Sequence, residues 1–272
     1  MAQRTSKWWE NTNCKYSYNQ HDVSTAKFQP GGTALLSINQ LSHKVIPSKL
    51  QDPTGLGRWT STLYQGKNNT TLRIVQVYRP CKPNPHSPNG VYQQHSRYFL
   101  NKHNETCPRQ QFLIDMHSFI TQCIQNSEQL IVMGDFNEDV TKPPISTFFT
   151  ELQMHNILHT LSPSLFTSSS STFNRGHTPI DAIFATQRLY ASRGGYLPSH
   201  VFDSDHKTIW IDLQLNMVFG NNKLSQPPLN CRRLKNEDPR VVKNSTHYIN
   251  HFFNSTIYHK HFLTSSTITQ CL

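Results

Sequence analysis

Side chains that can bind a metal ion or move a proton stand at the boundaries of short apolar segments in this chain. They are Tyr78, Asp135, Asn137, Asp181, Asp205 and His206. The ends of strands are where α/β proteins usually place their sites, because the scaffold is rigid there and side chains can converge. Carboxylates with an asparagine carbonyl form the hard oxygen site that Mg²⁺ or Mn²⁺ prefers, and a histidine beside them can handle charge on a phosphate. The pattern therefore indicates a divalent-metal site that acts on a phosphate.

Each of these residues has a more ordinary explanation when it is taken alone. A single aspartate at a strand end more often caps a turn or a helix. An isolated Asp-His pair is usually a surface feature without a role, and Tyr78 by itself is more often part of the core. Only their joint occurrence, in a fixed order and next to apolar segments, favours the chemical interpretation.

Hydrophobic patterning predicts the elements that would position these side chains. Apolar segments of strand length occupy residues 34–38, 71–78, 130–133, 180–185 and 208–213, and residues 56–66 alternate as a strand does. Residues 108–127 form the clearest predicted helix, because Pro108 suits a first turn and apolar residues recur at three- and four-residue spacing. A second amphipathic helix is predicted over residues 143–158. Strands that alternate with helices predict an α/β layered fold.

Composition narrows the class of partner. The chain has 272 residues, a formal net charge of +10 and a pI near 9.4, which favours a polyanion such as nucleic acid; solubility is the alternative explanation. No apolar run approaches the roughly 18 residues of a membrane-spanning helix, so no membrane partner is expected. The six cysteines form no Cys-x-x-Cys pair, so no zinc site is expected. The sequence leaves the oligomeric state open.

Three segments in the second half of the chain resemble motifs of one known superfamily. They are Gly134-Asp135-Phe136-Asn137, Ile180-Asp181-Ala182-Ile183-Phe184 and Ser204-Asp205-His206. They resemble the three C-terminal motifs of the endonuclease/exonuclease/phosphatase superfamily, and they occur in its order. Upstream, Val77-Tyr78-Arg79-Pro80 resembles its Tyr-x-Pro motif, and Gln29-Pro30-Gly31-Gly32-Thr33 resembles its glycine pair. Between the first two segments, Ser171-Thr172-Phe173 resembles the threonine motif that precedes the aspartate. The resemblance covers residues 28–215 and is closest to the endonucleases of non-LTR, LINE-like retrotransposons.

This resemblance implies a fold and a reaction. The implied fold is α/β, a four-layer sandwich of two mixed β-sheets flanked by helices, as in deoxyribonuclease I. The implied cofactor is Mg²⁺ or Mn²⁺, and the implied activity is metal-dependent phosphodiester hydrolysis. DNA would be the partner, and a nick with a terminal hydroxyl would be the product. A nuclear or cytoplasmic location follows from that substrate class.

The resemblance also implies roles for residues on the side of the attacking water and the phosphate. Asp135 would position or deprotonate the water. Asn137 would bind the scissile phosphate and help to hold the metal. Tyr78 would donate a hydrogen bond to a phosphate oxygen, and Thr172 would contact the substrate at the edge of the site.

The remaining implied roles belong to residues of the last two motifs. Asp181 would accept a hydrogen bond from His206 and so fix its tautomer and orientation. His206 would stabilise the five-coordinate phosphorus centre, and Asp205 would support the metal. Placement and charge stabilisation are what phosphoryl transfer requires of a protein.

The N-terminal part departs from the family pattern. The family begins with a strand ending in Asn and a strand ending in Gln-Glu, whose glutamate is a central metal ligand. Neither is recognisable before Gly31, and Glu10 is the only glutamate there, without the motif around it. We therefore expect an N-terminally truncated domain. The predicted organisation is an irregular segment at residues 1–27, the endonuclease-like domain at 28–215, and a basic, weakly ordered extension at 216–272.

Three functions are compatible with these observations. The first is a Mg²⁺-dependent DNA-nicking endonuclease derived from a retroelement. The second is a catalytically inactive, nucleic-acid-binding remnant of the same fold. The third is another phosphoesterase of the superfamily, which acts on a phosphoinositide or a nucleotide.

Overall fold

The structure, a computed structural model, describes residues 12–21, 31–161, 171–197, 204–214 and 218–220. All of them belong to one compact unit. Most of the extension predicted at residues 216–272 therefore lies outside the described residues, as do parts of the predicted segment 1–27. In the described part of the chain, no helix combines the length and the apolar character that crossing a membrane requires.

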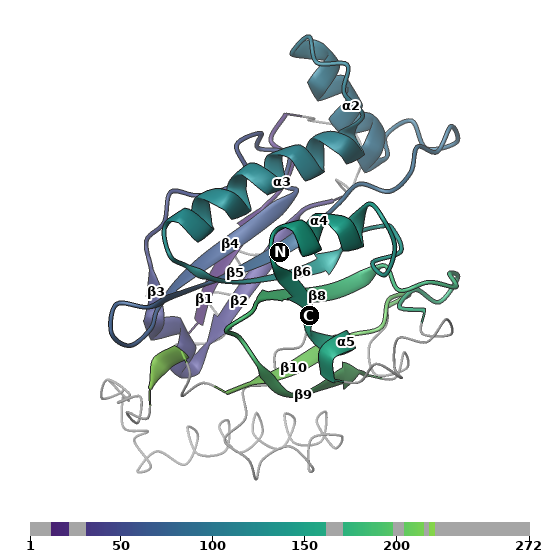
Figure 1. Ribbon diagram of the computed structural model, residues 1–272. Coiled ribbons are helices and arrows are strands. Elements are labelled where there is room, and N and C mark those ends of the chain that lie inside the picture. Colours follow the sequence, from purple (N-terminus) through teal and green to yellow (C-terminus); the bar gives the residue numbers. More distant parts are fainter. Residues whose placement is uncertain (1–11, 22–30, 162–170, 198–203, 215–217, 221–272) are drawn as a thin grey trace, which may run out of the picture. The chain divides into compact units, whose positions relative to one another are not determined.

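A six-stranded mixed sheet forms the centre of the unit, with the strand order β3-β4-β5-β6-β8-β7 (Figure 1). Its strands are β3 (Val45–Ile46), β4 (Trp59–Gln65), β5 (Thr71–Tyr78), β6 (Gln129–Asp135), β7 (Met154–Asn156) and β8 (Asp181–Thr186). Strands β5 and β6 are parallel, and the other neighbours are antiparallel. The predicted α/β class with a mixed sheet is confirmed.

Helices α3 (Pro108–Gln125) and α4 (Ile145–Glu151) cover one face of this sheet (Figure 1). Helix α2 (Val91–Asn101) packs against α3. Phe112, Met116 and Ile120 of α3 are fully buried and pack with Val75 and Val132 of the sheet in one hydrophobic cluster. This apolar face confirms the helix predicted over residues 108–127. Burial of such side chains contributes about 1.5–3 kcal/mol each.

Two antiparallel strand pairs pack against the other face. One pair joins β1 (Thr12–Ser17) to β2 (Thr33–Ile38), and the second joins β9 (Ala191–Tyr196) to β10 (Ile209–Leu213). The 3₁₀ helix η1 (Asn39–Lys44) and helix α5 (Ile157–Leu161) complete this side. A second hydrophobic cluster, which includes Leu35, Ile131, Leu158 and Ile209, joins these elements to the sheet. Instead of a second mixed sheet, the described residues thus form two separate pairs.

Most of the strands with apolar runs lie where the sequence predicts them, but the helix predicted over residues 143–158 is interrupted. Helix α4 ends at Glu151, and the chain reverses at Gln153, whose φ is +55°. Strand β7 then pairs with the edge of β8, and α5 follows. A non-glycine residue in the left-handed region ends a helix. The amphipathic pattern correctly indicated that apolar side chains of this segment are buried, but it did not indicate this reversal.

The irregular structure predicted for residues 1–27 is wrong for Thr12–Ser17, which forms β1. This segment has little apolar alternation, and each of its six residues pairs with one residue of β2. Hydrogen bonds to β2 satisfy its backbone, and a local pattern does not reveal such a long-range partner.

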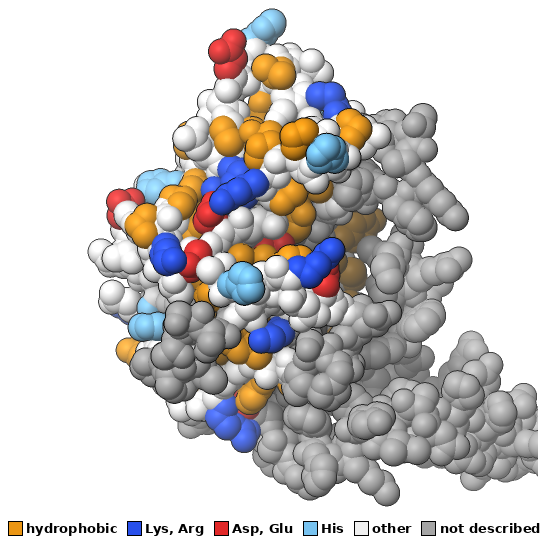
Figure 2. All heavy atoms as spheres, turned by 90° about the vertical axis from the view of Figure 1, so that its right-hand side faces the viewer, with side chains coloured by type: hydrophobic (Ala, Val, Ile, Leu, Met, Phe, Trp, Pro, Cys, Tyr) orange, Lys and Arg blue, Asp and Glu red, His pale blue; other side chains and the backbone are white. Residues whose placement is uncertain are grey.

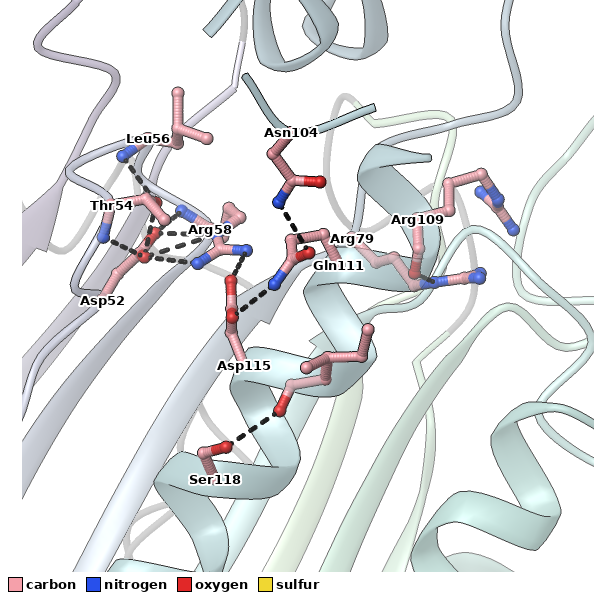
Figure 3. A network of polar contacts seen from close by, with 11 residues as sticks. Asp52, Thr54, Leu56, Arg58, Arg79, Asn104, Arg109, Gln111, Asp115 and Ser118 are labelled. Carbon is pink, nitrogen blue, oxygen red and sulfur yellow. Dashed lines mark hydrogen bonds and ion pairs between the residues drawn. The ribbon is translucent and has the colours of Figure 1, made fainter. Parts of the chain in front are cut away.

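A buried charge network ties the start of β4 to α3 (Figure 3). The guanidinium group of Arg58, which has no exposed surface, lies 2.8 Å from Asp52 and 2.7 Å from Asp115 of α3. Gln111 donates to Asp115 at 2.7 Å, which extends the network along the helix. The backbone carbonyl of Arg58 accepts a hydrogen bond from the N–H of Tyr78 at 2.8 Å. The network therefore also fixes the end of β5, where the candidate site begins.

Candidate active site

The register of the central sheet brings three predicted site residues side by side. Tyr78 at the end of β5 pairs with Asp135 at the end of β6, and Asp135 pairs with Asp181 at the start of β8. Neighbouring strands lie about 4.8 Å apart, so these side chains share one edge of the sheet. All three line an open pocket of about 630 Å³, and His206 lines it too.

Gly134 allows β6 to end in this position. Its φ is +141°, and a Cβ atom there would lie 2.1 Å from the carbonyl oxygen of Val77 on the neighbouring strand. No other residue type can pack the strands this closely. The glycine of the Gly-Asp-Phe-Asn segment is thus required by the packing of β6 on β5.

Asp135 and Asn137 form a small hydrogen-bonded unit just after β6. The Asn137 backbone N–H donates to Asp135 Oδ1 at 2.8 Å, and the Asn137 side-chain amide donates to Asp135 Oδ2 at 2.9 Å. The same amide nitrogen also donates to the backbone carbonyl of Arg79 at 2.8 Å. Asn137 has a φ of +50°, a conformation that asparagine tolerates better than most residues. The unit joins the loop after β6 to the loop after β5.

Asp181 and His206 are in direct contact. The Oδ2 atom of Asp181 lies 2.9 Å from Nδ1 of His206, and because an ionised carboxylate only accepts hydrogen bonds, Nδ1 carries the proton. His206 also lies against Phe173, with the ring centroids 5.1 Å apart. The side chains of His206 and Asp181 are 31% and 14% exposed, so the imidazole remains accessible from the pocket.

Thr172 holds the backbone of Asp181 in place. Its side chain is fully buried, and its hydroxyl oxygen accepts hydrogen bonds from the backbone N–H groups of Ile180 and Asp181 at 2.9 and 3.1 Å. The substrate contact predicted for Thr172 stays a prediction. In this geometry the hydroxyl positions the start of β8.

The electrostatics of the site favour a bound cation. Burial, followed by repulsion from Asp181, raises the pKa of Asp135 to about 7. The hydrogen bond from His206 to Asp181 raises the pKa of His206 above its ordinary value. Burial raises the pKa of Tyr78 to about 12, so its phenol keeps the proton that it would donate. Two neighbouring carboxylates repel each other until a positive charge comes between them.

The donor set fits a divalent metal ion. Asp135, Asp181 and His206 each offer a ligand atom, and these atoms lie within 4.8 Å of one another. Among the described residues this is the only such group of histidine, cysteine and acidic side chains. Carboxylate oxygens are the ligands that Mg²⁺ and Mn²⁺ prefer. Asn137 is hydrogen-bonded to Asp135, and its predicted role at the metal stays a prediction.

The structure does not bring Asp205 into this group. Its carboxylate, 53% exposed, lies 3.0 Å from the guanidinium of Arg175, which in turn lies over the ring of Phe173. The metal-supporting role predicted for Asp205 therefore stays a prediction. Glu10 lies outside the described residues.

Three residues near the site were missed by the sequence analysis. Arg79 and Arg109 are buried and share the carboxylate of Glu138, which directly follows Asn137. Arg79 stands inside the Val77-Tyr78-Arg79-Pro80 segment, so its place in that motif could have indicated it. Arg109 carries no such signal, because only the tertiary structure brings the first turn of α3 to this loop.

Several solved structures are similar to this chain. The catalytic domain of human Nocturnin with a bound sulfate anion is 16% identical, with a TM-score of 0.46, and the match covers 74% of this chain and 71% of that one. The catalytic domain of Xenopus laevis APE2 is 17% identical, with a TM-score of 0.47, and the match covers 79% of each chain. An AP endonuclease from Archaeoglobus fulgidus is 14% identical, with a TM-score of 0.43, and the match covers 65% of this chain and 73% of that one.

Comparisons at the level of sequence give the family. Among the curated proteins no relative matches this chain. The sequence profile of the Endonuclease/Exonuclease/phosphatase family matches residues 3–206, which is well over half of the 272 residues. That match begins upstream of residue 28, where the motif resemblance begins, and it ends at His206. The chain therefore belongs to the Endonuclease/Exonuclease/phosphatase family.

Proposed function

We propose that this chain is a Mg²⁺- or Mn²⁺-dependent phosphodiesterase that nicks DNA. The observation that carries the proposal is the Asp181–His206 contact beside Asp135 in one pocket. Membership of the family supports metal-dependent phosphodiester hydrolysis, and the geometry supplies groups that suit it. DNA as the substrate, Mg²⁺ as the metal and an origin in a LINE-like retroelement are the finer parts of the proposal.

Asp135 and Asp181 would hold the metal, with Asn137 nearby. A divalent cation bound there would polarise the phosphate and lower the pKa of a bound water. Asp135 would orient the attacking water and accept its proton, which the metal makes easier to release. Asn137 would orient the Asp135 carboxylate, because it donates its two side-chain amide hydrogens to Asp135 and to the Arg79 carbonyl. Its predicted contact with the scissile phosphate would need one of these hydrogen bonds to open.

His206 and Tyr78 would stabilise the charge that develops on the phosphate. The Asp181 carboxylate favours the protonated imidazole of His206, and the Nε2–H group on the far side of the ring would donate to a phosphate oxygen. The phenol of Tyr78 would donate to a second oxygen. The sheet register fixes Tyr78, and the contact with Asp181 fixes His206, so little reorganisation would accompany the reaction.

Charge supports a nucleic-acid substrate. Lys82 follows β5, Lys142 follows β6 and Arg175 precedes β8. Their side chains are 72%, 70% and 77% exposed, and each is paired with a carboxylate. Figure 2 shows lysine and arginine side chains scattered among acidic and histidine side chains on the face that lies to the right in Figure 1. Exposed cations around an acidic site can follow a phosphate backbone without masking the metal ligands. A nuclear or cytoplasmic location belongs to this proposal.

The second candidate is a nucleic-acid-binding remnant without activity. The exposed cations favour binding, and the pairing of Asp205 with Arg175 removes one carboxylate from the metal group. Such a protein would bind DNA with a strong dependence on salt, but would not cleave it.

A plasmid assay separates these candidates. The full chain is incubated with supercoiled plasmid in Mg²⁺, in Mn²⁺ or in EDTA, and the relaxed circle is quantified. We expect nicking with either metal, none in EDTA, and none by the Asp135→Ala/His206→Ala double variant. The matched control is Glu151→Gln/His86→Ala, which changes an exposed acid and an exposed histidine outside the pocket.

Each other outcome decides against the proposal. Nicking that persists unchanged in the Asp135→Ala/His206→Ala variant is contamination and overturns the enzymatic function. Salt-dependent DNA binding without nicking supports the remnant. Hydrolysis of a nucleotide or of an inositol phosphate, with DNA left intact, supports a different phosphoesterase of the family.

A further inference from the structure

Two buried arginines meet one carboxylate beside the loop that carries Asn137. Arg79 and Arg109 are 3% and 6% exposed. Arg79 Nη1 lies 3.5 Å from Glu138 Oε2, and Arg109 Nη2 donates to the same oxygen. Lys82 approaches the other carboxylate oxygen from the surface at 3.5 Å. Buried like charges need a neutralising partner, and Glu138 supplies it.

The guanidinium groups of this cluster also hold main-chain carbonyls of the site loops. Arg109 donates to the carbonyl oxygens of Pro80 at 2.6 Å and of Asn137 at 3.0 Å. Arg79 donates to the carbonyl of Arg109 at 3.3 Å, as Figure 3 shows, and to that of Phe136 at 3.3 Å. Hydrogen bonds from a charged donor are about twice as strong as neutral ones. The cluster therefore joins the loop after β5, the loop after β6 and the first turn of α3.

The backbone of Asn137 is in the left-handed region, with a φ of +50°. Asparagine tolerates this conformation better than most residues, and hydrogen bonds from the surroundings stabilise it further. Arg109 donates a hydrogen bond to the main-chain carbonyl of Asn137. The side-chain amide nitrogen of Asn137 donates to the carbonyl of Arg79 and to Asp135. If the hydrogen bond from Arg109 is lost, the main chain at Asn137 can relax, and the Asn137 side-chain amide can turn away from Asp135.

We infer that Arg109, with Glu138 and Arg79, is a positioning residue that holds the Asn137 amide against Asp135 and so fixes the orientation of the Asp135 carboxylate. The inference deepens the proposed function and rests on it, because the role of Asp135 at the metal and the attacking water is part of that function. The cluster differs from the Arg73–Glu128 pair, another buried ion pair at this sheet. Arg73 binds Glu128 and the hydroxyl groups of Ser48 and Ser61, but no carbonyl of a site loop.

The first test reads the position of the Asn137 side chain without any activity. The full chain is labelled with ¹⁵N-asparagine, and the side-chain amide signals of Asn137 are assigned from the spectrum of Asn137→Ala. We expect Arg109→Lys to shift or broaden these signals, because lysine cannot hold two carbonyls and the carboxylate together. The matched control Arg73→Lys changes a buried, carboxylate-paired arginine and should leave them in place. Unmoved Asn137 signals in folded Arg109→Lys would overturn the inference.

The second test is a double-mutant cycle on DNA cleavage. We expect Arg109→Lys to lower kcat roughly tenfold with a smaller change in KM, since displaced groups cost transition-state stabilisation. In the Asn137→Ala background the same change should have almost no further effect, because the positioned group is already gone. A merely structural arginine would lower kcat by the same factor in both backgrounds, and that result would overturn the inference. Arg73→Lys should leave kcat unchanged in both.

The two tests separate this inference from the proposed function. If the wild-type chain cleaves no DNA, the proposed function fails, and the Asn137 signals still decide whether Arg109 positions that side chain. If Arg109→Lys does not fold, Glu138→Gln replaces it, because it keeps both arginines and removes only the charge between them. The same displacement of the Asn137 signals is then expected, and its absence counts against the inference.

Discussion

Asp181 Oδ2 and His206 Nδ1 lie 2.9 Å apart, although 25 positions separate the two residues in the chain. Asp181 begins β8, whereas His206 comes later in the chain, after β9 and before β10. An isolated bridge between Phe173 and His206 brings the two segments together, and the backbone of Lys207 bonds that of Thr172. The contact depends on tertiary packing, and the predicted chemistry depends on the contact.

Replacement of Asp181 by Asn should lower the pKa of His206 and weaken catalysis. The raised pKa of His206 has its largest cause in the hydrogen bond to Asp181, and an amide does not stabilise the imidazolium. We expect the imidazole C–H signals of EDTA-treated protein to titrate at lower pH in Asp181→Asn. Nicking should fall roughly 10- to 100-fold, as for other partners that orient a catalytic group. Equal titration in both proteins would show that Asp181 does not influence the imidazole.

Mg²⁺ should stabilise the protein more at pH 8 than at pH 5.5. The folded-state pKa of Asp135 is about 7, against an ordinary 3.8. Between these values the unfolded carboxyl has lost its proton and the folded one keeps it. The stability of the metal-free protein therefore falls as the pH rises from about 4 to 7, by on the order of 4 kcal/mol. Binding of the cation favours the ionised carboxylate and relieves this loss.

The measurement for Asp135 is the melting temperature with Mg²⁺ and with EDTA at both pH values. The Mg²⁺-induced rise should be larger at pH 8. Asp135→Asn should show little difference between the two pH values, and Glu151→Gln should behave as the wild type. A rise of equal size at both pH values in the wild type would contradict the prediction.

His95 should make the protein less stable in mild acid. It is 1% exposed, and burial, followed by the charge of Arg58, lowers its pKa to about 4. In the unfolded chain the imidazole is protonated below pH 6.5. The free energy of unfolding is therefore not reduced by His95 above pH 6.5, and it decreases by up to about 3 kcal/mol as the pH falls towards 4. Urea unfolding at pH 7 and pH 5 should show a smaller difference for His95→Gln than for the wild type. The exposed His86→Gln serves as the control, and a parallel decline in all three proteins would exclude His95 as the cause.

Thr172→Val should lower both stability and activity, whereas Thr172→Ser should preserve much of each. Valine has the shape of threonine, but it leaves the N–H groups of Ile180 and Asp181 without their acceptor. Unsatisfied N–H groups cost up to about 1–3 kcal/mol each when buried and less when partly buried, as here, and the free energy of unfolding in urea measures the loss. The displaced Asp181 should reduce nicking as well. If Thr172→Val matches Thr172→Ser in both measurements, the hydroxyl does not position β8.

Local patterning was sufficient for the elements with strong periodicity. The alternation in residues 71–78 and the short apolar runs at 130–133 and 180–185 correspond to β5, β6 and β8. These strands are central and buried, so their sequences directly carry the requirement for burial. The sequence did not indicate β1 or β9, because one has little apolar alternation and the other contains two glycines. Both exist because a neighbouring strand pairs with them.

The sequence by itself determined which residue types stand at the ends of the site strands, because apolar runs define those ends and the motifs follow directly. Only the tertiary structure decided which of these residues meet. The pairing of β5, β6 and β8 aligns Tyr78, Asp135 and Asp181, and the return of the chain beyond β9 brings His206 to Asp181. The tertiary structure also pairs Asp205 with Arg175 and brings Arg109 to the loop that carries Asn137. Strand register and helix docking are long-range, and they depend on the sum of many packing contacts rather than on any local pattern.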